Sequence, residues 1–395
     1  MVEGMEYELL AWLLLAVLGG LPAAGLWFSL PPERRLWPPQ RHRAVPWGAA
    51  ELGIGLFLTL LWNFLIYHSL YIAVAGANIL VHRWHDQPFS WVLPESVDKN
   101  LKVLWTPSVT VFFQVATFLL VLHIVSGTRL YQVGLTTSHA VQNFISGFLV
   151  WLVLTPLVYG VNFLVALFYF WQWGAPPEEH HPLTELAEGQ PLKVYQWVLF
   201  VFVAVVAAPA SEELIFRGIL QPWLTRRPWG GYAALVLAFA MAFLQGADVA
   251  GRWPVVFILA MVPGFLLVVY LPWRWLPHPD AAGAIYGTAL LWAALHSFAW
   301  PTPIPLFFLG LGLGFLAYRT QSLVGTITIH SLFNGLTCLA LILAYLLPAH
   351  QPDTGSVTTS AACCPAAVSI SSCVPACSLP LRMYASASGA PKRGE

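Results

Sequence analysis

The sequence predicts an all-α membrane protein, a polytopic transmembrane helical bundle with about ten spans. Three observations lead to this prediction. Only 9% of the 395 residues are charged and 58% are hydrophobic, whereas a soluble globular domain carries about 25% charge. The apolar residues gather in runs of roughly 20 residues, the length that crosses a bilayer as a helix. These runs also lack the period-2 alternation of a transmembrane β-barrel.

The expected spans follow one another along most of the chain. In order, they are 9–30, 50–82, 104–125, 143–170, 194–216, 231–248, 254–273, 281–300, 303–318 and 322–348. Polar residues interrupt the stretch 231–273, which could form two helices or one helix with a re-entrant segment. Three glutamates and no Lys or Arg precede the first run, which is the wrong charge for a secretory signal. We therefore expect the first span to be retained.

The few charges exclude several classes of protein and predict an orientation. With 18 basic and 18 acidic residues, neither a soluble enzyme nor a nucleic-acid binder is expected. The loop 31–46 holds four arginines, and the loop 171–193 holds four glutamates and one lysine. Because basic loops stay cytoplasmic, we expect the N-terminus outside. We also expect an integral protein of the cell (inner) membrane, with lipid as a partner.

Two adjacent glutamates, Glu212 and Glu213, lie in an apolar run, where an ionisable side chain costs at least ~2.5–3.5 kcal/mol near the membrane centre. Arg217 follows Glu213 by four residues, so these two side chains share a helix face and can pair. Glu212 lies about 100° around the helix from them. The spacing predicts a structural Glu213–Arg217 pair and a separate Glu212 that could act as a general base. Alternatively, both glutamates simply pair with Arg217 at the membrane interface.

Four histidines also lie in apolar runs: His68, His123, His296 and His330. Nothing reactive surrounds His68 or His123, which we expect to be packed and hydrogen-bonded. Asn334 follows His330 by four residues on the same helix face. Both side chains can donate hydrogen bonds toward one point, as an oxyanion site requires.

Together, Glu212, His296, His330 and Asn334 could hydrolyse an acyl bond. One carboxylate and one imidazole could activate a water, while the second imidazole and the amide stabilise a tetrahedral intermediate. Glu212, His296 and His330 could instead ligate zinc and leave a position open for water. The expected depths disagree, however. Glu212 lies about 27 Å along its span, near the cytoplasmic side, and His296 about 22 Å from residue 281. One helix must be tilted, begin above the membrane, or have other limits.

Three motifs resemble those of the CPBP family, the CAAX proteases and bacteriocin-processing proteins also called Abi. Ser211–Gly218 is similar to the family's EExxxR motif, and His330–Asn334 to its HxxxN motif. Trp292–His296 resembles FxxxH, with Trp292 in place of Phe, an exchange that we expect to be tolerated. The motifs occur in the family's order. HExxH, Gly-x-Gly-Asp and Gly-x-Ser-x-Gly, which mark other protease classes, do not occur in the chain.

The resemblance implies an intramembrane endopeptidase that cleaves a peptide or protein, with a prenylated substrate as one option. It implies Glu212 and His296 as the water-activating pair and His330 and Asn334 as the oxyanion pair. Glu213 and Arg217 would support them, toward the cytoplasmic side. Zinc remains open as a cofactor. The alternatives are a non-catalytic membrane scaffold or immunity factor on the same fold, and a proton-coupled transporter that uses Glu212.

The resemblance also suggests how the chain is divided. Residues 1–193 would form N-terminal membrane helices, and 194–348 a CPBP-like protease core with an inserted hairpin at 231–280. The tail 351–395 is rich in Ser, Ala, Pro and Thr, a composition that is typical of disordered low-complexity segments. We expect an accessory tail without chemistry of its own, although its four cysteines could form disulfides, bind metal or carry palmitate.

Overall fold

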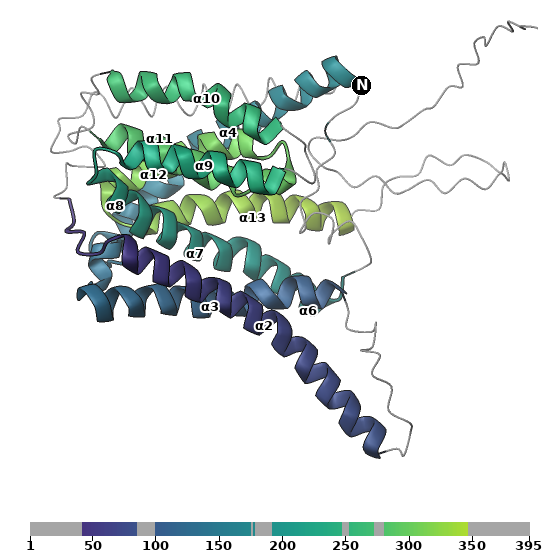
Figure 1. The fold of residues 1–395 in the computed structure, drawn as a ribbon. Coiled ribbons are helices and arrows are strands. Elements are labelled where there is room, and N and C mark those ends of the chain that lie inside the picture. The colour runs from purple at the N-terminus through teal and green to yellow at the C-terminus, as the bar shows by residue number, and fades with distance from the viewer. Residues whose placement is uncertain are drawn as a thin grey trace, which may run out of the picture.

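The computed structural model describes residues 42–84, 99–174, 177, 192–246, 253–271 and 280–346. In these ranges every regular element is a helix (Figure 1), which confirms the predicted fold class. Seven of the described helices are long and apolar enough to cross a membrane, and two shorter helices are also apolar. The expected span 9–30 and the tail 351–395 lie outside the described residues.

Each of the nine expected spans from 50–82 onward corresponds to a helix. Their bounds are α2 (Ala49–Trp84), α3 (Lys99–Ser126), α4 (Ala140–Trp173), a continuous helix from Val194 to Thr225, α9 (Gly230–Gly246), α10 (Trp253–Tyr270), α11 (Ala281–Ala294), α12 (Pro303–Thr320) and α13 (Val324–Leu346). Short 3₁₀ turns, η2 (Leu130–Val133) and η5 (Ser297–Ala299), lie between helices. The uncertain stretch 231–273 forms two helices, α9 and α10.

The helix Val194–Thr225 is not uniform. It consists of α6 (Val194–Val201), the π segment η3 (Phe202–Ala207), α7 (Ala208–Glu213), a second π segment η4 (Leu214–Leu220) and α8 (Gln221–Thr225). The two glutamates therefore lie at the end of a short α-helical stretch between two π segments. Single π turns within α-helices occur frequently at functional sites.

This helix also ends nine residues later than the expected limit at 216. The sequence turns polar there, but the polar side chains are buried and hydrogen-bonded. Gln221 Nε2 donates to the carbonyl oxygen of Gly314 at 2.8 Å, and Thr225 Oγ1 donates to that of Gln221 at 2.7 Å. Because these groups find partners inside the protein, the helix continues where a limit drawn from hydropathy ends it.

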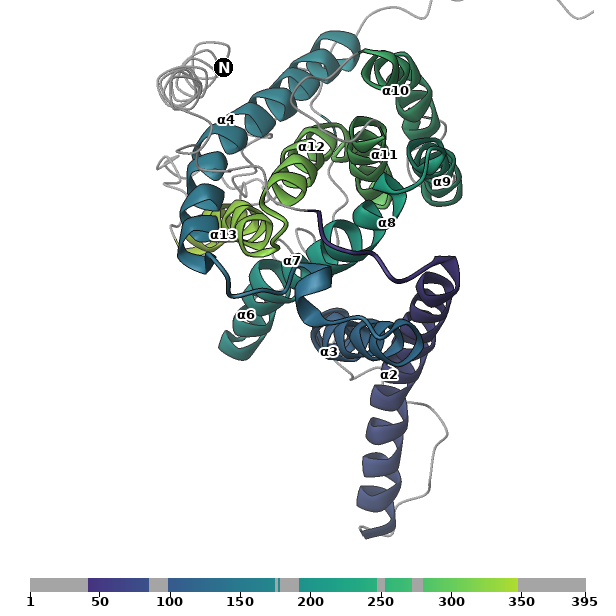
Figure 2. The same cartoon turned by 90° about the vertical axis from the view of Figure 1, so that its left-hand side faces the viewer.

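Helix α11 is the centre of the bundle. All fourteen of its residues are buried, and it packs mainly against α9 and α12. Figure 2 shows α11, α12 and α8 in the middle, with α4 on one side and α9 and α10 on the other. The approach of α9 to α11 depends on glycine, because a Cβ on Gly231 would lie 2.7 Å from the carbonyl carbon of Gly283.

Helices α2 and α3 pair with each other at the edge of this bundle (Figure 2). Their outer faces carry exposed large apolar side chains, for example Leu60 at 69% and Ile124 at 75% exposure. Surfaces of this kind fit contact with lipid rather than water. The buried Trp47, just before α2, donates from its indole nitrogen to the carbonyl oxygen of Ile219 at 3.2 Å. This bond ties the N-terminal helix pair to the helix that carries the glutamates.

Candidate active site

Glu213 and Arg217 form a fully buried ion pair. Nη1 of Arg217 lies 3.0 Å from Oε1 of Glu213, and the two side chains are 1% and 0% exposed. The pair that the i, i+4 spacing predicts is therefore present. The pair is buried inside the bundle.

Arg217 has further partners that compensate for the burial of its charge. Its guanidinium carbon lies 4.7 Å from the ring centroid of Trp292, a cation–π distance. Nη2 also approaches the carbonyl oxygen of Gly310 at 3.5 Å. A buried cation with an anion, an aromatic face and a carbonyl around it holds a fixed geometry. The charged pair can therefore serve as a rigid support for neighbouring side chains.

His330 contacts the second glutamate of the motif, a contact that the sequence did not predict. Its Nδ1 lies 3.1 Å from Oε1 of Glu213, and the imidazole is 4% exposed. One carboxylate oxygen therefore accepts from both Arg217 and His330. Because an ionised carboxylate only accepts hydrogen bonds, Nδ1 of His330 carries the hydrogen in this contact.

Glu212 lies next to this group and is half-buried. Its Oε2 accepts a hydrogen bond from the indole Nε1 of Trp292 at 2.6 Å. The Trp292 ring in turn contacts two imidazoles edge-on, those of His296 and His330, each with a centroid distance of 5.4 Å. The structure thus brings Glu212, His296 and His330 together around one buried tryptophan.

His296 lies just beyond the C-terminal end of α11 and is half-buried. Its Nδ1 is 3.0 Å from the carbonyl oxygen of Trp292. A carbonyl can only accept, so this contact assigns the hydrogen to Nδ1. The Nε2 atom of a neutral His296 then presents a lone pair, as a general base requires.

The side chain of Asn334 donates to the backbone carbonyl of Ala204, which receives no backbone N–H in the π segment η3. Ala208 N–H donates five residues back, to Val203 O, and in the same register residue 209 would donate to Ala204. Residue 209 is proline and has no N–H. Asn334 Nδ2 donates to Ala204 O instead, at 2.8 Å. One of its two amide hydrogens is thereby used, and the second is left for another acceptor.

The disagreement in depth disappears with the observed helix limits. Glu212 lies thirteen residues before Thr225, the end of its helix, which is about 20 Å at 1.5 Å per residue. His296 lies fifteen residues after the start of α11, which is about 22 Å. The expected span limits were wrong, and Glu212 lies well inside its helix rather than near its end.

The described residues contain no group of three or more His, Cys, Asp or Glu side chains placed to hold a metal ion. Of the three expected zinc ligands, His330 directs Nδ1 to Glu213, His296 directs Nδ1 to a carbonyl, and Glu212 accepts from Trp292. Zinc binding on this set therefore stays a prediction for experiment.

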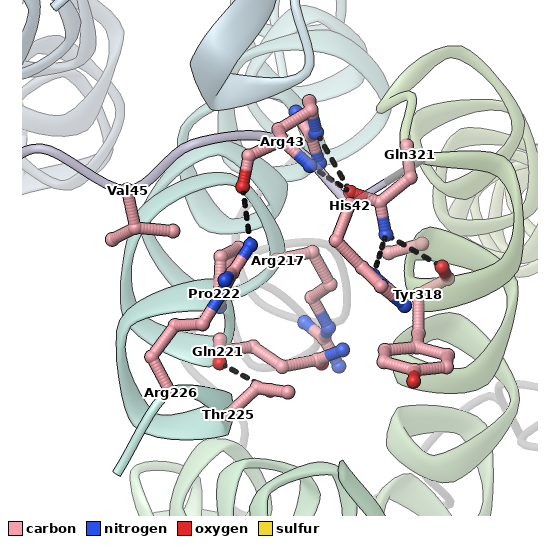
Figure 3. A pocket seen from close by; sticks show the side chains of 11 residues that line it. His42, Arg43, Val45, Arg217, Gln221, Pro222, Thr225, Arg226, Tyr318 and Gln321 are labelled. Carbon is pink, nitrogen blue, oxygen red and sulfur yellow. Dashed lines mark hydrogen bonds between the residues drawn. The ribbon is translucent and has the colours of Figure 1, made fainter. Parts of the chain in front are cut away.

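A basic pocket lies on the other side of Arg217, toward Thr225 (Figure 3). None of its eleven described lining residues is acidic. Arg226 donates to the carbonyl oxygen of Arg43 at 2.8 Å, and Arg43 Nε donates to Gln321 Oε1 at 3.2 Å. Burial lowers the pKa of Arg43 to about 10, which leaves it charged at neutral pH. The cavity in this pocket has a volume of about 20 Å³, about the space that a single water occupies.

Comparison with known proteins supports the three motifs. Two overlapping segments of the chain, 194–276 and 264–336, match the family model described as "Type II CAAX prenyl endopeptidase Rce1-like". The matched region contains Glu212, His296, His330 and Asn334, the four residues that the sequence singled out. Neither the curated proteins nor the solved structures gave a match.

Proposed function

We propose that the protein is an intramembrane endopeptidase, because residues 194–276 and 264–336 match the Rce1-like CAAX prenyl endopeptidase family model. The substrate would be a peptide or protein that reaches the membrane, and the reaction is hydrolysis of a peptide bond by an activated water. One observation carries this proposal. Three reactive side chains that are far apart in sequence, Glu212, His296 and His330, gather around Trp292.

Glu212 is the proposed base for the attacking water. Trp292 occupies Oε2 of its carboxylate, which leaves Oε1 to accept a proton from water. His296 adds a second proton acceptor through Nε2, because Nδ1 is held by the Trp292 carbonyl. The resulting hydroxide equivalent attacks the scissile carbonyl carbon. The proton that Glu212 or His296 takes up is then passed to the leaving amine.

His330 and Asn334 are the proposed donors to the oxyanion that forms on the carbonyl oxygen. Nδ1 of His330 is committed to Glu213, so only a protonated His330 can also donate from Nε2. The Glu213 carboxylate accepts the hydrogen bond from Nδ1 in that form. The second amide hydrogen of Asn334 supplies the other donor. Glu213 is thus more than a partner of Arg217, because it holds Nδ1 of His330 and leaves Nε2 for the reaction.

The proposed substrate class follows from the family's description. A CAAX prenyl endopeptidase acts next to a prenylated cysteine near a C-terminus. A prenyl chain would dissolve in the lipid beside the exposed apolar helices, and the peptide would then meet Glu212 inside the bundle. We therefore propose a lipid-anchored C-terminal peptide as the first substrate to test.

The test uses the full chain in lipid nanodiscs. The probes are a fluorogenic peptide ending in a farnesylated cysteine followed by three residues, and its unprenylated counterpart. We expect cleavage by the wild type and a loss of at least about 10²–10³-fold in kcat for Glu212→Gln, His296→Ala and His330→Ala. The control is His68→Ala, which changes an imidazole in α2. Equal cleavage by the wild type and all three site variants would overturn the proposal.

The same samples separate the two rival functions. A non-catalytic scaffold would cleave neither probe, whether or not Glu212 is replaced. A proton-coupled transporter would cleave neither probe but would carry a Glu212-dependent proton flux in sealed vesicles. Either result contradicts the endopeptidase proposal.

A further inference from the structure

Trp292 has a contact that a phenylalanine at this position could not make. The FxxxH motif that the chain resembles has Phe at this point, and a ring at an apolar helix position usually only fills space. Here the indole N–H donates to Glu212 Oε2 at 2.6 Å. The side chain is 1% exposed, so water does not compete strongly for this bond. A hydrogen bond to a charged acceptor is stronger than one between neutral groups.

We propose that Trp292 is a positioning residue that orients both members of the water-activating pair. Its side chain fixes one oxygen of Glu212, and its backbone carbonyl fixes Nδ1 of His296. The two contacts leave Glu212 Oε1 and His296 Nε2 as the atoms that can take a proton. A base that is held by a third group is the arrangement that activates nucleophiles in hydrolases generally.

The surroundings of Trp292 keep the indole itself from moving. Arg217 lies over its ring at 4.7 Å, and the His296 and His330 imidazoles make T-shaped contacts with it. It belongs to α11, of which every residue is buried. The orientation of Glu212 is thereby tied to the buried Glu213–Arg217 pair. The positioning role rests on the proposed endopeptidase activity, in which Glu212 is the base.

The primary test is Trp292→Phe, which keeps an aromatic ring and removes only the donor and part of the ring. With the farnesylated fluorogenic peptide, we expect kcat to fall roughly 10- to 100-fold, the range for a lost hydrogen bond to a charged group. KM should change less than about threefold, because the lost contact acts on the base and not on the substrate. The matched control is Trp62→Phe, which removes an indole bond to Thr117 (3.0 Å) between α2 and α3 and should leave kcat unchanged.

A double-mutant cycle distinguishes positioning of Glu212 from a general packing effect. In a Glu212→Asp background the carboxylate is drawn back from Trp292, so Trp292→Phe should cost less than about threefold. In an Asn334→Ala background, Trp292→Phe should still lower kcat by the full 10- to 100-fold. Equal costs in both backgrounds would show that Trp292 acts through packing.

A second variant covers the case in which the phenylalanine protein does not fold. Replacing Trp292 by 3-benzothienylalanine keeps the size of the ring system and removes the N–H. The same 10- to 100-fold fall in kcat is expected. A variant with wild-type kcat would overturn the positioning role. The endopeptidase proposal would survive that result if Glu212→Gln still abolished cleavage, so the two failures are distinguishable.

Discussion

Nδ1 of His330 lies 3.1 Å from Oε1 of Glu213, the same oxygen that accepts from Arg217 at 3.0 Å. This shared atom connects three helical segments, because His330 comes from α13, Glu213 from α7 and Arg217 from η4. The ion pair of the EExxxR motif and the histidine of the HxxxN motif therefore form one buried group. A change in any of the three side chains should affect the other two.

Loss of Arg217 should strongly destabilise the fold. Arg217→Met removes the cation and leaves the Glu213 carboxylate buried without its main partner. Breaking a buried ion pair in this way typically costs about 3–5 kcal/mol of folding free energy. Thermal unfolding of the purified protein in detergent measures this effect. Arg227→Gln, at an exposed arginine of the same region, is the control and should leave the melting temperature nearly unchanged. Equal melting temperatures for Arg217→Met and the wild type would contradict this role of the pair.

Replacement of Asn334 should reduce both stability and activity. Asn334→Leu leaves the carbonyl of Ala204 without a donor, which costs about 1–3 kcal/mol. It also removes one oxyanion donor, so kcat on the farnesylated peptide should fall about 10²–10³-fold. Asn63→Leu on α2 removes a similar amide-to-carbonyl bond (3.1 Å to Thr59 O) and should leave kcat unchanged. A stability loss without a loss of kcat would assign Asn334 a purely structural role.

Two glycines of α4 should respond differently to a methyl group. A Cβ on Gly147 would lie 2.5 Å from the carbonyl oxygen of Gly325 in α13, whereas one on Gly160 meets nothing within 4 Å. Gly147→Ala should therefore cost about 1–3 kcal/mol, as overpacking does. Gly160→Ala should be neutral or slightly stabilising, because alanine favours helices. Thermal unfolding of both variants tests this difference, and similar melting temperatures would mean that α4 and α13 do not pack this closely.

A zinc-dependent reaction and a metal-independent reaction predict different effects of a chelator on cleavage. If Glu212, His296 and His330 act without a metal, dialysis against a chelator should leave cleavage unchanged. Metal analysis should then show no stoichiometric zinc in active protein. Loss of cleavage that added Zn²⁺ restores would instead support zinc ligation by this set. Cleavage and metal content should be measured on the same preparation.

The order and number of the described helices could be read from the sequence because runs of apolar residues follow from the thickness of a bilayer. Their limits could not. Gln221 and Thr225 look like the end of a span, but each is hydrogen-bonded inside the bundle. Whether a polar side chain ends a helix depends on partners such as Gly314, which lies 93 residues further along the chain.

In the candidate site, too, local contacts could be predicted from the sequence and long-range contacts could not. The pairing of Glu213 with Arg217 follows from helix geometry alone, and the structure contains it. The contact of His330 with Glu213 joins residues 117 positions apart, and no local rule predicts it. The sequence marks Trp292 only as an aromatic replacement for the motif's Phe. The one available signal was chemical: a tryptophan carries an N–H, and a buried N–H requires an acceptor.

The two π segments, η3 and η4, have a consequence for aligning this chain with others. A π turn closes its hydrogen bonds one residue further back than an α turn, so each segment accommodates an additional residue in the helix Val194–Thr225. A related chain without one of them would match this helix only after a single-residue gap inside a membrane span. An alignment without that gap would place Glu212 of this chain opposite the wrong residue of the other chain.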